Sequence, residues 1–278
     1  AEFSQNNILN LAALIVDLEK NEVISYIGNV NFSNRQSGNQ VDVIQSPRST
    51  GSILKPFLYC AMLQEGALLP RELLPDIPIN VGGFSPKNFS LQYDGATPAN
   101  EALARSLNVP WVVSLRKYGV AKFYDFLKKT GISTLTKTAD YYGLSLILGG
   151  AEGTLWEIAN GFSHLARTVN DYNQSNEYFE IEDFSVQLMD NNIKRKKTSS
   201  PVFNAGAAWI TLEALTNLNR PEEIDWQFIP SIRKVAWKTG TSFGFRDGWA
   251  IGVTPKYLVA VWTGNASGEG RPGLTGAR

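Results

Sequence analysis

The chain has 278 residues, of which 43% are hydrophobic and 19% charged, and its formal net charge at pH 7 is zero. This composition is typical of a folded globular protein, and the zero net charge argues against a nucleic-acid-binding protein, whose affinity depends on excess basic residues. The single cysteine, Cys60, excludes an internal disulfide and a thiolate metal cage, and the single histidine, His164, excludes a multi-histidine metal site. We therefore expect no metal and no cofactor.

The length is that of one large domain or two small ones. No apolar run reaches the roughly 18–20 residues that span a bilayer, and Ala1 does not begin a signal-peptide pattern. A strand pattern begins almost at once. We therefore interpret residues 1–278 as part of a longer protein, and we expect any membrane anchor to lie outside this chain.

The first predicted elements form a β-hairpin. Asn10–Asp17 and Val23–Gly28 are apolar segments with strand composition, and Lys20-Asn21 between them has turn chemistry. The polar stretch Asn31–Gln45 predicts a loop.

The next segment places a hydroxyl and an amine three residues apart, at Ser52 and Lys55, where a helix begins. Pro56 is tolerated only in the first turn of a helix, so we predict a tight, 3₁₀-like turn over Ser52–Lys55 that holds the two side chains together. A serine hydroxyl becomes a nucleophile when a base takes its proton, and a lysine with suppressed charge can be that base. Alone, this pair much more often means a helix-capping serine and a surface lysine.

The middle of the chain predicts helices. Leu69–Gly95 is rich in proline and glycine and predicts a long irregular excursion, the kind of loop that often lines a site. The helices that follow are predicted at Pro98–Asn108, Val109–Leu127 after a break near Pro110, Thr154–Thr168 and Ala205–Leu218, with a short apolar turn at Leu144–Leu148 and a peripheral hairpin at Phe179–Ile193.

The last segment predicts three consecutive strands, Lys234–Ser242, Gly248–Thr254 and Tyr257–Thr263. With the N-terminal hairpin they make about five mostly antiparallel strands, and the helices all lie between the two groups in sequence. We therefore predict an α/β (α+β) fold in which both ends of the chain meet in one sheet with helices on its faces.

Two further stretches carry chemistry. Ser106 and Asn108 are two residues apart, and a helix end near Pro110 would let both side chains point into one cleft. On the predicted strand, Lys238, Gly240 and Ser242 share one face, with Thr239 and Thr241 on the other unless the strand bends. A glycine inside a strand usually marks the close approach of another backbone or a ligand. A lysine and hydroxyls beside it suit an anionic group such as a carboxylate.

The three motifs, in this order and spacing, resemble those of the penicilloyl-serine transferase family. Flanking stretches are similar to the transpeptidase domain of class A penicillin-binding proteins, and one is most similar to the penicillin-binding protein 1C branch. The resemblance covers about Asn10 to Gly276 and rests on Ser49-Thr-Gly-Ser-x-Leu-Lys-Pro-Phe57, Pro86-x-Asn88-Phe89, Ala102-x-x-x-Ser106-Leu-Asn-Val-Pro110, Leu148-Gly-Gly-Ala-Glu152 and Trp237-Lys-Thr-Gly-Thr-Ser-Phe-Gly-Phe-Arg-Asp-Gly-Trp249.

The resemblance implies a role for each residue of the first two motifs. Ser52 would be the acylated nucleophile and Lys55 its general base. Ser106 would relay a proton toward the leaving amine, and Asn108 would bind substrate and hold Lys55.

The resemblance also gives roles to the third motif. Lys238 would anchor the Ser106 hydroxyl and lower the pKa of Lys55 by like-charge repulsion. Thr239 and Thr241 would bind the substrate carboxylate, with Gly240 and Ser242 beside them. The backbone N–H groups of Ser52 and Thr241 would form the oxyanion hole.

The implied fold is a β-lactamase/transpeptidase-like sheet with an all-helical lobe, and the implied activity is peptidoglycan D,D-transpeptidation. The expected partners are D-Ala-D-Ala stem peptides, an amine acceptor, β-lactam antibiotics and other proteins of cell-wall synthesis. The expected location is the extracytoplasmic face of the cytoplasmic membrane. We expect residues 1–278 to be an incomplete transpeptidase domain, without the glycosyltransferase domain and the closing helix that the family normally has. A D,D-carboxypeptidase or a β-lactam-binding sensor or silent docking module remains the alternative.

Other titratable residues have structural interpretations. His164 lies on an otherwise apolar helix and predicts a core-edge histidine. Cys60 lies on the apolar helix after Ser52 and is expected to be buried and inert. Glu157 does not match a deacylation motif, and we place it on a helix surface. We expect Arg246 and Asp247 to pair at a hairpin tip.

Overall fold

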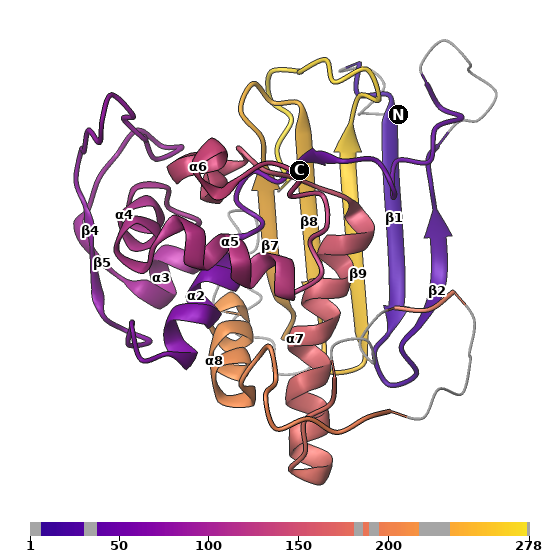
Figure 1. The fold of residues 1–278 in the computed structure, drawn as a ribbon. Coiled ribbons are helices and arrows are strands. Elements are labelled where there is room, and N and C mark those ends of the chain that lie inside the picture. Colours follow the sequence, from indigo (N-terminus) through magenta and orange to yellow (C-terminus); the bar gives the residue numbers. More distant parts are fainter. Residues whose placement is uncertain (1–6, 31–37, 181–185, 189–194, 217–233, 277–278) are drawn as a thin grey trace.

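The computed structural model describes residues 7–30, 38–180, 186–188, 195–216 and 234–276. Its centre is a five-stranded sheet in the order β2-β1-β9-β8-β7, in which every neighbouring pair is antiparallel (Figure 1). The strands are β1 Asn10–Asp17, β2 Glu22–Ile27, β7 Ala236–Thr241, β8 Asp247–Val253 and β9 Tyr257–Gly264. The predicted five-stranded sheet, built from both ends of the chain, is confirmed.

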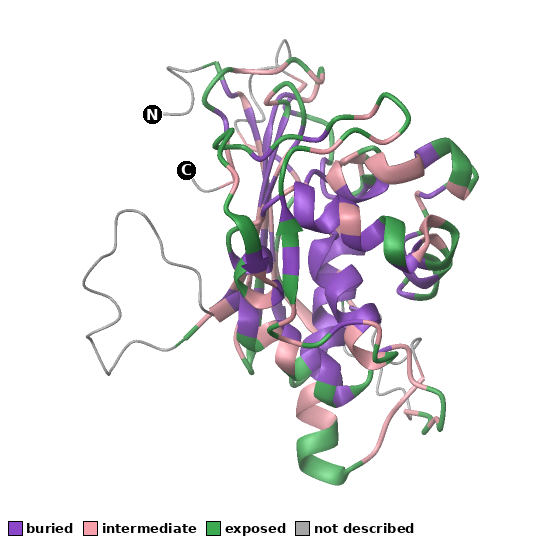
Figure 2. Ribbon diagram, turned by 90° about the vertical axis from the view of Figure 1, so that its left-hand side faces the viewer, coloured by how far each residue is buried: buried purple, intermediate pink, exposed green. Residues whose placement is uncertain are grey.

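Alternation along the strands defines the inner face of the sheet. In β1 the residues Ala12, Leu14 and Val16 are buried, while Leu11, Ala13 and Ile15 are only partly covered. Helix α7 (Leu155–Ser175) packs across this face against β9, β1 and β8 (Figure 1). Figure 2 shows the buried residues concentrated where the helices meet the sheet.

A helical lobe lies beside the β7 edge of the sheet (Figure 1). Its elements are α2 Lys55–Gln64, α3 Ala99–Ala104, α4 Val109–Tyr118, α5 Val120–Lys129, α6 Ala139–Tyr142, the 3₁₀ helix η2 Gly143–Leu148 and α8 Ala205–Thr216. Helix α2 is buried along its first eight residues, Lys55–Met62, so the lobe is built around it. No helix in the described ranges is both long and apolar enough to cross a bilayer.

The structure also contains two short two-stranded sheets, β4-β5 and β3-β6. β4 (Leu73–Asp76) pairs with β5 (Gly95–Pro98), so the predicted irregular excursion is closed at its base by this pair. β3 (Arg48–Ser49) pairs with β6 (Glu152–Gly153) directly before the Ser52 turn.

One predicted helix is divided in two, and one predicted turn lies outside the described residues. The single helix predicted over Val109–Leu127 is wrong, because Gly119 takes a φ of +102° and divides the segment into α4 and α5. A positive φ is accessible to glycine without steric cost, and this is why the chain breaks there. The predicted turn of the Phe179–Ile193 hairpin, at 190–192, lies outside the described residues.

Candidate active site

Ser52 lies in a 3₁₀-like turn that leads into α2, as predicted. Backbone hydrogen bonds of the i to i−3 type run from Ile53 N–H to Thr50 O (3.0 Å) and from Lys55 N–H to Ser52 O (3.3 Å). Pro56 follows in the first turn of α2, where its missing N–H leaves no carbonyl unsatisfied. Residues three apart eclipse in such a turn, so the Ser52 and Lys55 side chains share one side of it.

Main-chain atoms of two segments, β7 and the stretch at Ala151, hold this turn in place. A β-carbon at Gly51, whose φ is +52°, would lie 2.6 Å from the carbonyl oxygen of Thr241 in β7. A β-carbon at Gly240 would lie 2.9 Å from the carbonyl oxygen of Thr50, which confirms the predicted close approach of another backbone. On the other side, Thr50 N–H donates to Ala151 O at 3.1 Å. The position of Ser52 is therefore fixed by backbone-on-backbone packing.

Lys55 is fully buried at the first position of α2. Its Nζ donates to Ser106 O at 2.9 Å and to Asn108 Oδ1 at 2.7 Å. Burial, and then the positive charge of Lys238, hold the pKa of Lys55 well below its usual value. A neutral amine has only two N–H donors, and these two acceptors can use both, so its lone pair is left for a further partner.

Ser106 ends α3 in a strained conformation. The bonds Ser106 N–H to Leu103 O and Leu107 N–H to Ala102 O, both 3.0 Å, form a Schellman motif with Ser106 at the left-handed position. Its φ is +57°, where glycine is the usual residue. This turn directs both Ser106 and Asn108 toward the lysines, so the prediction that a helix end brings the two side chains into one site is confirmed.

Lys238 on β7 completes the cluster. Its Nζ donates to Ser106 Oγ at 2.8 Å and also to the carbonyl oxygen of Thr239. The side chain is 2% exposed, and burial lowers its pKa to about 7. The structure thus brings Lys55, Ser106, Asn108 and Lys238 into one hydrogen-bonded group beside the Ser52 turn.

The threonines and the serine after Lys238 differ in surroundings. Thr239 and Thr241 are half-buried on the opposite face of β7 from Lys238, and Thr241 Oγ1 accepts a hydrogen bond from Gly276 N at 3.2 Å. Ser242 is 3% exposed, and its hydroxyl donates to Asp247 Oδ2 at 2.7 Å and accepts from Asp247 N at 2.9 Å. Its side chain therefore fastens the β7–β8 connection.

The predicted pair at this hairpin tip has a different form. Asp247 turns inward, where its second carboxylate oxygen accepts from the indole N–H of Trp262 at 3.1 Å. Arg246 is exposed, and its Nε donates to Phe243 O. Burial raises the pKa of Asp247, with Ser242 and Trp262 opposing the shift. This carboxylate is part of the hairpin's interior.

The prediction that Glu157 lies on a helix surface is wrong, because its side chain is buried. It forms a capping box with Thr154 at the start of α7. Its carboxylate also accepts hydrogen bonds from the backbone and hydroxyl groups of Ser133 and Thr134, at 2.6–3.0 Å. The carboxylate therefore joins the start of α7 to the loop after α5.

His164 and Cys60 are both in the core. His164 is 2% exposed and packs against the ring of Phe203, and burial lowers its pKa to about 3. Cys60 is fully buried, and burial raises the pKa of its thiol to about 12, so the expectation of an inert cysteine is supported.

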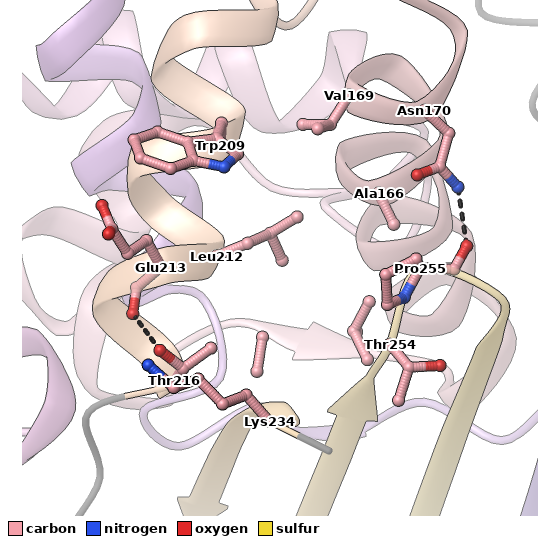
Figure 3. A pocket seen from close by; sticks show the side chains of 12 residues that line it. Ala166, Val169, Asn170, Trp209, Leu212, Glu213, Thr216, Lys234, Thr254 and Pro255 are labelled. Atoms are coloured by element: carbon pink, nitrogen blue, oxygen red, sulfur yellow. Dashed lines mark hydrogen bonds between the residues drawn. The ribbon is translucent and has the colours of Figure 1, made fainter. Parts of the chain in front are cut away.

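A separate cavity of about 280 Å³ lies between α7, α8 and the ends of β7 and β8 (Figure 3). Trp209 and Leu212 of α8 face Val169 across it, and Asn170 Nδ2 donates to Pro255 O at 2.7 Å. None of its lining residues belongs to the lysine and serine cluster. Among the described residues, no group of three or more His, Cys, Asp or Glu side chains is arranged to hold a metal ion.

Sequence comparison places the chain among transpeptidases. The family model described as penicillin binding protein transpeptidase domain matches residues 11–272. Penicillin-binding protein 1C of Escherichia coli is 35% identical over 259 residues, which is 93% of this chain and 31% of that protein. Penicillin-binding protein 1B of Vibrio cholerae is 27% identical over 278 residues, 97% of this chain and 34% of that protein. The chain spans about a third of the length of these relatives.

Solved structures agree on the fold. Penicillin-binding protein 1A from Haemophilus influenzae has a TM-score of 0.73 at 21% identity, covering 96% of this chain and 45% of that one. PonA1 from Mycobacterium tuberculosis in complex with penicillin V has a TM-score of 0.71 at 19% identity, covering 96% and 73%. The family match over residues 11–272 decides the assignment. The chain belongs to the penicillin-binding protein transpeptidase domain family.

Proposed function

We propose that this domain is a serine D,D-transpeptidase of peptidoglycan synthesis, with Ser52 as the acylated residue. The observation that carries the proposal is the pair of buried lysines. One is bonded to Ser106 O and Asn108 Oδ1, the other to Ser106 Oγ, and both lie beside the serine turn. Lys55, with its lowered pKa, supplies a base, and the amine of Lys238 holds the hydroxyl of Ser106.

Acylation begins with Ser52. Its Oγ attacks the carbonyl carbon of the penultimate D-Ala of a D-Ala-D-Ala stem peptide, and its proton passes to the neutral amine of Lys55. The carbonyl oxygen becomes an oxyanion. We assign its two donors to the backbone N–H groups of Ser52 and Thr241, since β7 packs directly on the Ser52 turn at Gly51.

Expulsion of the terminal D-Ala needs a proton on its nitrogen. Lys238 donates to Ser106 Oγ at 2.8 Å, so the hydroxyl's own proton is free to point at the leaving nitrogen. The C–N bond breaks as that proton is delivered, and Ser106 is reprotonated from the lysine cluster, which consists of Lys55 and Lys238. Thr239 and Thr241 are the proposed ligands of the terminal carboxylate.

An amine of a neighbouring stem peptide then attacks the acyl-enzyme. Its nitrogen forms a bond to the acyl carbon and loses a proton to the lysine cluster, while the ester C–O bond breaks and Ser52 recovers its proton. A β-lactam ring opens on Ser52 by the same first step, and the opened product keeps its leaving group attached. We infer that the domain works at the extracytoplasmic face of the membrane, where stem peptides are cross-linked.

A labelled penicillin tests the reactive residue. We expect covalent label on a single peptide containing Ser52 in the native protein, and none in Ser52→Ala. The matched control is Ser200→Ala, the same substitution at an exposed serine, which should label like the native protein. Equal labelling of the Ser52→Ala variant would refute the assignment.

A peptide assay separates the candidate activities. With a D-Ala-D-Ala stem peptide and an added acceptor amine, a transpeptidase yields a new amide in proportion to the acceptor. Release of the shortened peptide without amide would identify a carboxypeptidase. Stable labelling by penicillin with neither product would identify a sensor or silent docking module.

A further inference from the structure

We propose that Asn88, held by Asp76, is a positioning residue that sets the orientation of Asn108 and through it the place of the Lys55 amine. This inference rests on the proposed function for the meaning of Lys55. Both Asn88 and Asp76 lie in or at the base of the excursion between β4 and β5, and each is only 1% exposed.

Asn88 supplies the cap that α4 does not have from its own sequence. The N-cap residue of α4 is Asn108, and its side chain makes no capping hydrogen bond. Asn88 Oδ1 instead accepts from the backbone N–H groups of Asn108 (2.9 Å) and Val109 (3.2 Å), which belong to the first turn of the helix. An amide from 20 residues earlier thus fixes the backbone of Asn108.

Lys87, the residue before Asn88, fixes the side chain of Asn108. Asn108 Nδ2 donates to Lys87 O at 2.8 Å. With its NH₂ group committed to this carbonyl, the amide must present Oδ1 to the other side, where it accepts from Lys55 Nζ at 2.7 Å. Residues 87 and 88 therefore hold Asn108 at both its backbone and its side chain, and this determines which atom Lys55 meets.

Asp76 holds Asn88 in turn. Asp76 Oδ1 accepts from Asn88 Nδ2 at 2.7 Å, and Oδ2 accepts from the backbone N–H of Asp94 at 3.0 Å. Asn88 Nδ2 also donates to Gln92 O at 2.9 Å. Both oxygens of a buried carboxylate are thus hydrogen-bonded, as burial of a charge requires. With this partner in place, the amide group of Asn88 keeps its oxygen directed at α4.

The carboxylate of Asp94 connects this hydrogen-bond network to Ser106, the first residue of the Ser-x-Asn motif. It forms an ion pair with Arg105, the residue immediately before Ser106. Asp76 is therefore connected through Asn88 to Asn108 and through Asp94 to the segment that carries Ser106. The excursion acts as a support for the whole Ser-x-Asn segment.

Two measurements on Asn88→Ala test the inference. Hydrogen–deuterium exchange at the Asn108 and Val109 amides should accelerate at least tenfold, because both lose their acceptor. The second-order rate of acylation by a labelled penicillin should fall at least tenfold. The matched control is Asn80→Ala, in the same excursion, whose side chain forms local hydrogen bonds with Ser85 and Gly83. It should change neither quantity.

An exchange of partners separates positioning from general damage. In Asp76→Asn/Asn88→Asp the donor and acceptor of the hydrogen bond between positions 76 and 88 trade places, so a carboxylate oxygen still accepts from the N-terminus of α4, while Gln92 O loses the donor that Asn88 Nδ2 provided. We expect hydrogen exchange at Asn108 to be at least threefold slower, and acylation at least threefold faster, in the double variant than in the Asn88→Asp single variant, where two carboxylates face each other.

The exchange measurements decide the role of Asn88, and acylation of the native protein decides the proposed function. Unchanged exchange in Asn88→Ala, or a double variant that folds with exchange at Asn108 no slower than in the Asn88→Asp single variant, would overturn the inference. If Asn88→Ala does not fold, the double variant carries the test, and its own failure to fold counts against the inference. If the native protein is not acylated at all, the proposed function fails, while the exchange measurements still decide the role of Asn88.

Discussion

The left-handed conformation of Ser106 leads to a prediction about stability that reverses the usual order of residues. At the C′ position of a Schellman motif with φ +57°, any residue with a β-carbon is strained. We therefore expect Ser106→Gly to be more stable than Ser106→Ala. Both variants remove the hydroxyl that Lys238 contacts, so the difference between them isolates the backbone.

The size of the difference follows from two opposing terms. A left-handed conformation costs a residue with a β-carbon roughly 1–2 kcal/mol. Glycine offsets part of this through the greater entropy of its unfolded chain, about 0.4–1 kcal/mol. The net advantage of glycine is then about 0.5–1 kcal/mol in the free energy of unfolding. For a domain of this size it raises the melting temperature by roughly 1–4 °C.

Denaturant titration of the two variants, followed by circular dichroism, measures the difference. The same two substitutions at Ser114, in the middle of α4, are the control. There alanine should be more stable by about 1 kcal/mol, the ordinary helix preference. In both Ser106 variants acylation should fall by about 10²–10⁴-fold, because the proposed proton relay is gone. An alanine variant at position 106 at least as stable as the glycine variant would refute the reasoning.

Three further predictions concern charge and burial. Lys238→Met removes a like charge, so the pKa of Lys55 should rise and the pH midpoint of acylation by penicillin with it; an unchanged or lower midpoint would contradict the coupling. Glu157→Ala should lower the free energy of unfolding by about 2–4 kcal/mol, because several buried donors lose their acceptor; a loss below 0.5 kcal/mol in denaturant titration would show that water replaces it. His164 has a folded pKa of about 3 against an ordinary 6.5, so the unfolded state binds more protons between these values, and stability should fall as pH drops from 6.5 toward 3. His164→Phe should flatten this part of the stability curve, and a variant with the native slope would assign the effect to other groups.

Most of the fold could be predicted from local patterns. The strands at both ends of the chain have alternating or continuous apolar runs bounded by turn residues, and such periodicity survives in the folded sheet. The break at Gly119 was missed because an isolated glycine in a helical pattern is often tolerated. Proline at 110 drew attention instead, yet it lies harmlessly in the first turn of α4.

The parts of the site that lie close together in the sequence could be predicted from the spacing of their residues. Ser52 and Lys55 are close in sequence, and Pro56 fixed the kind of turn between them. The support of Asn108 by Asn88 and Asp76 depends on contacts between distant segments, which no local pattern reveals. Glu157 was placed wrongly for the same reason, since its capping box is local but its burial comes from the loop at Ser133. The sole sequence signal for Asn88 was its place in a stretch similar to the family.

The pairing of β1 with β9 has a consequence for the order in which the chain folds. Asn10 lies opposite Gly264, so the strand next to the edge of the sheet finds its second neighbour only after almost the entire chain is available. Contacts of such high sequence separation make folding slow, because loop closure must precede any gain from pairing. Within the helical lobe, α4 packs on α5 and α5 on α6, and these neighbours in sequence can associate earlier. Lys238, on β7, reaches Ser106 only when β7–β9 have joined the sheet, so the hydrogen bond between these two side chains should form in the last stage of folding.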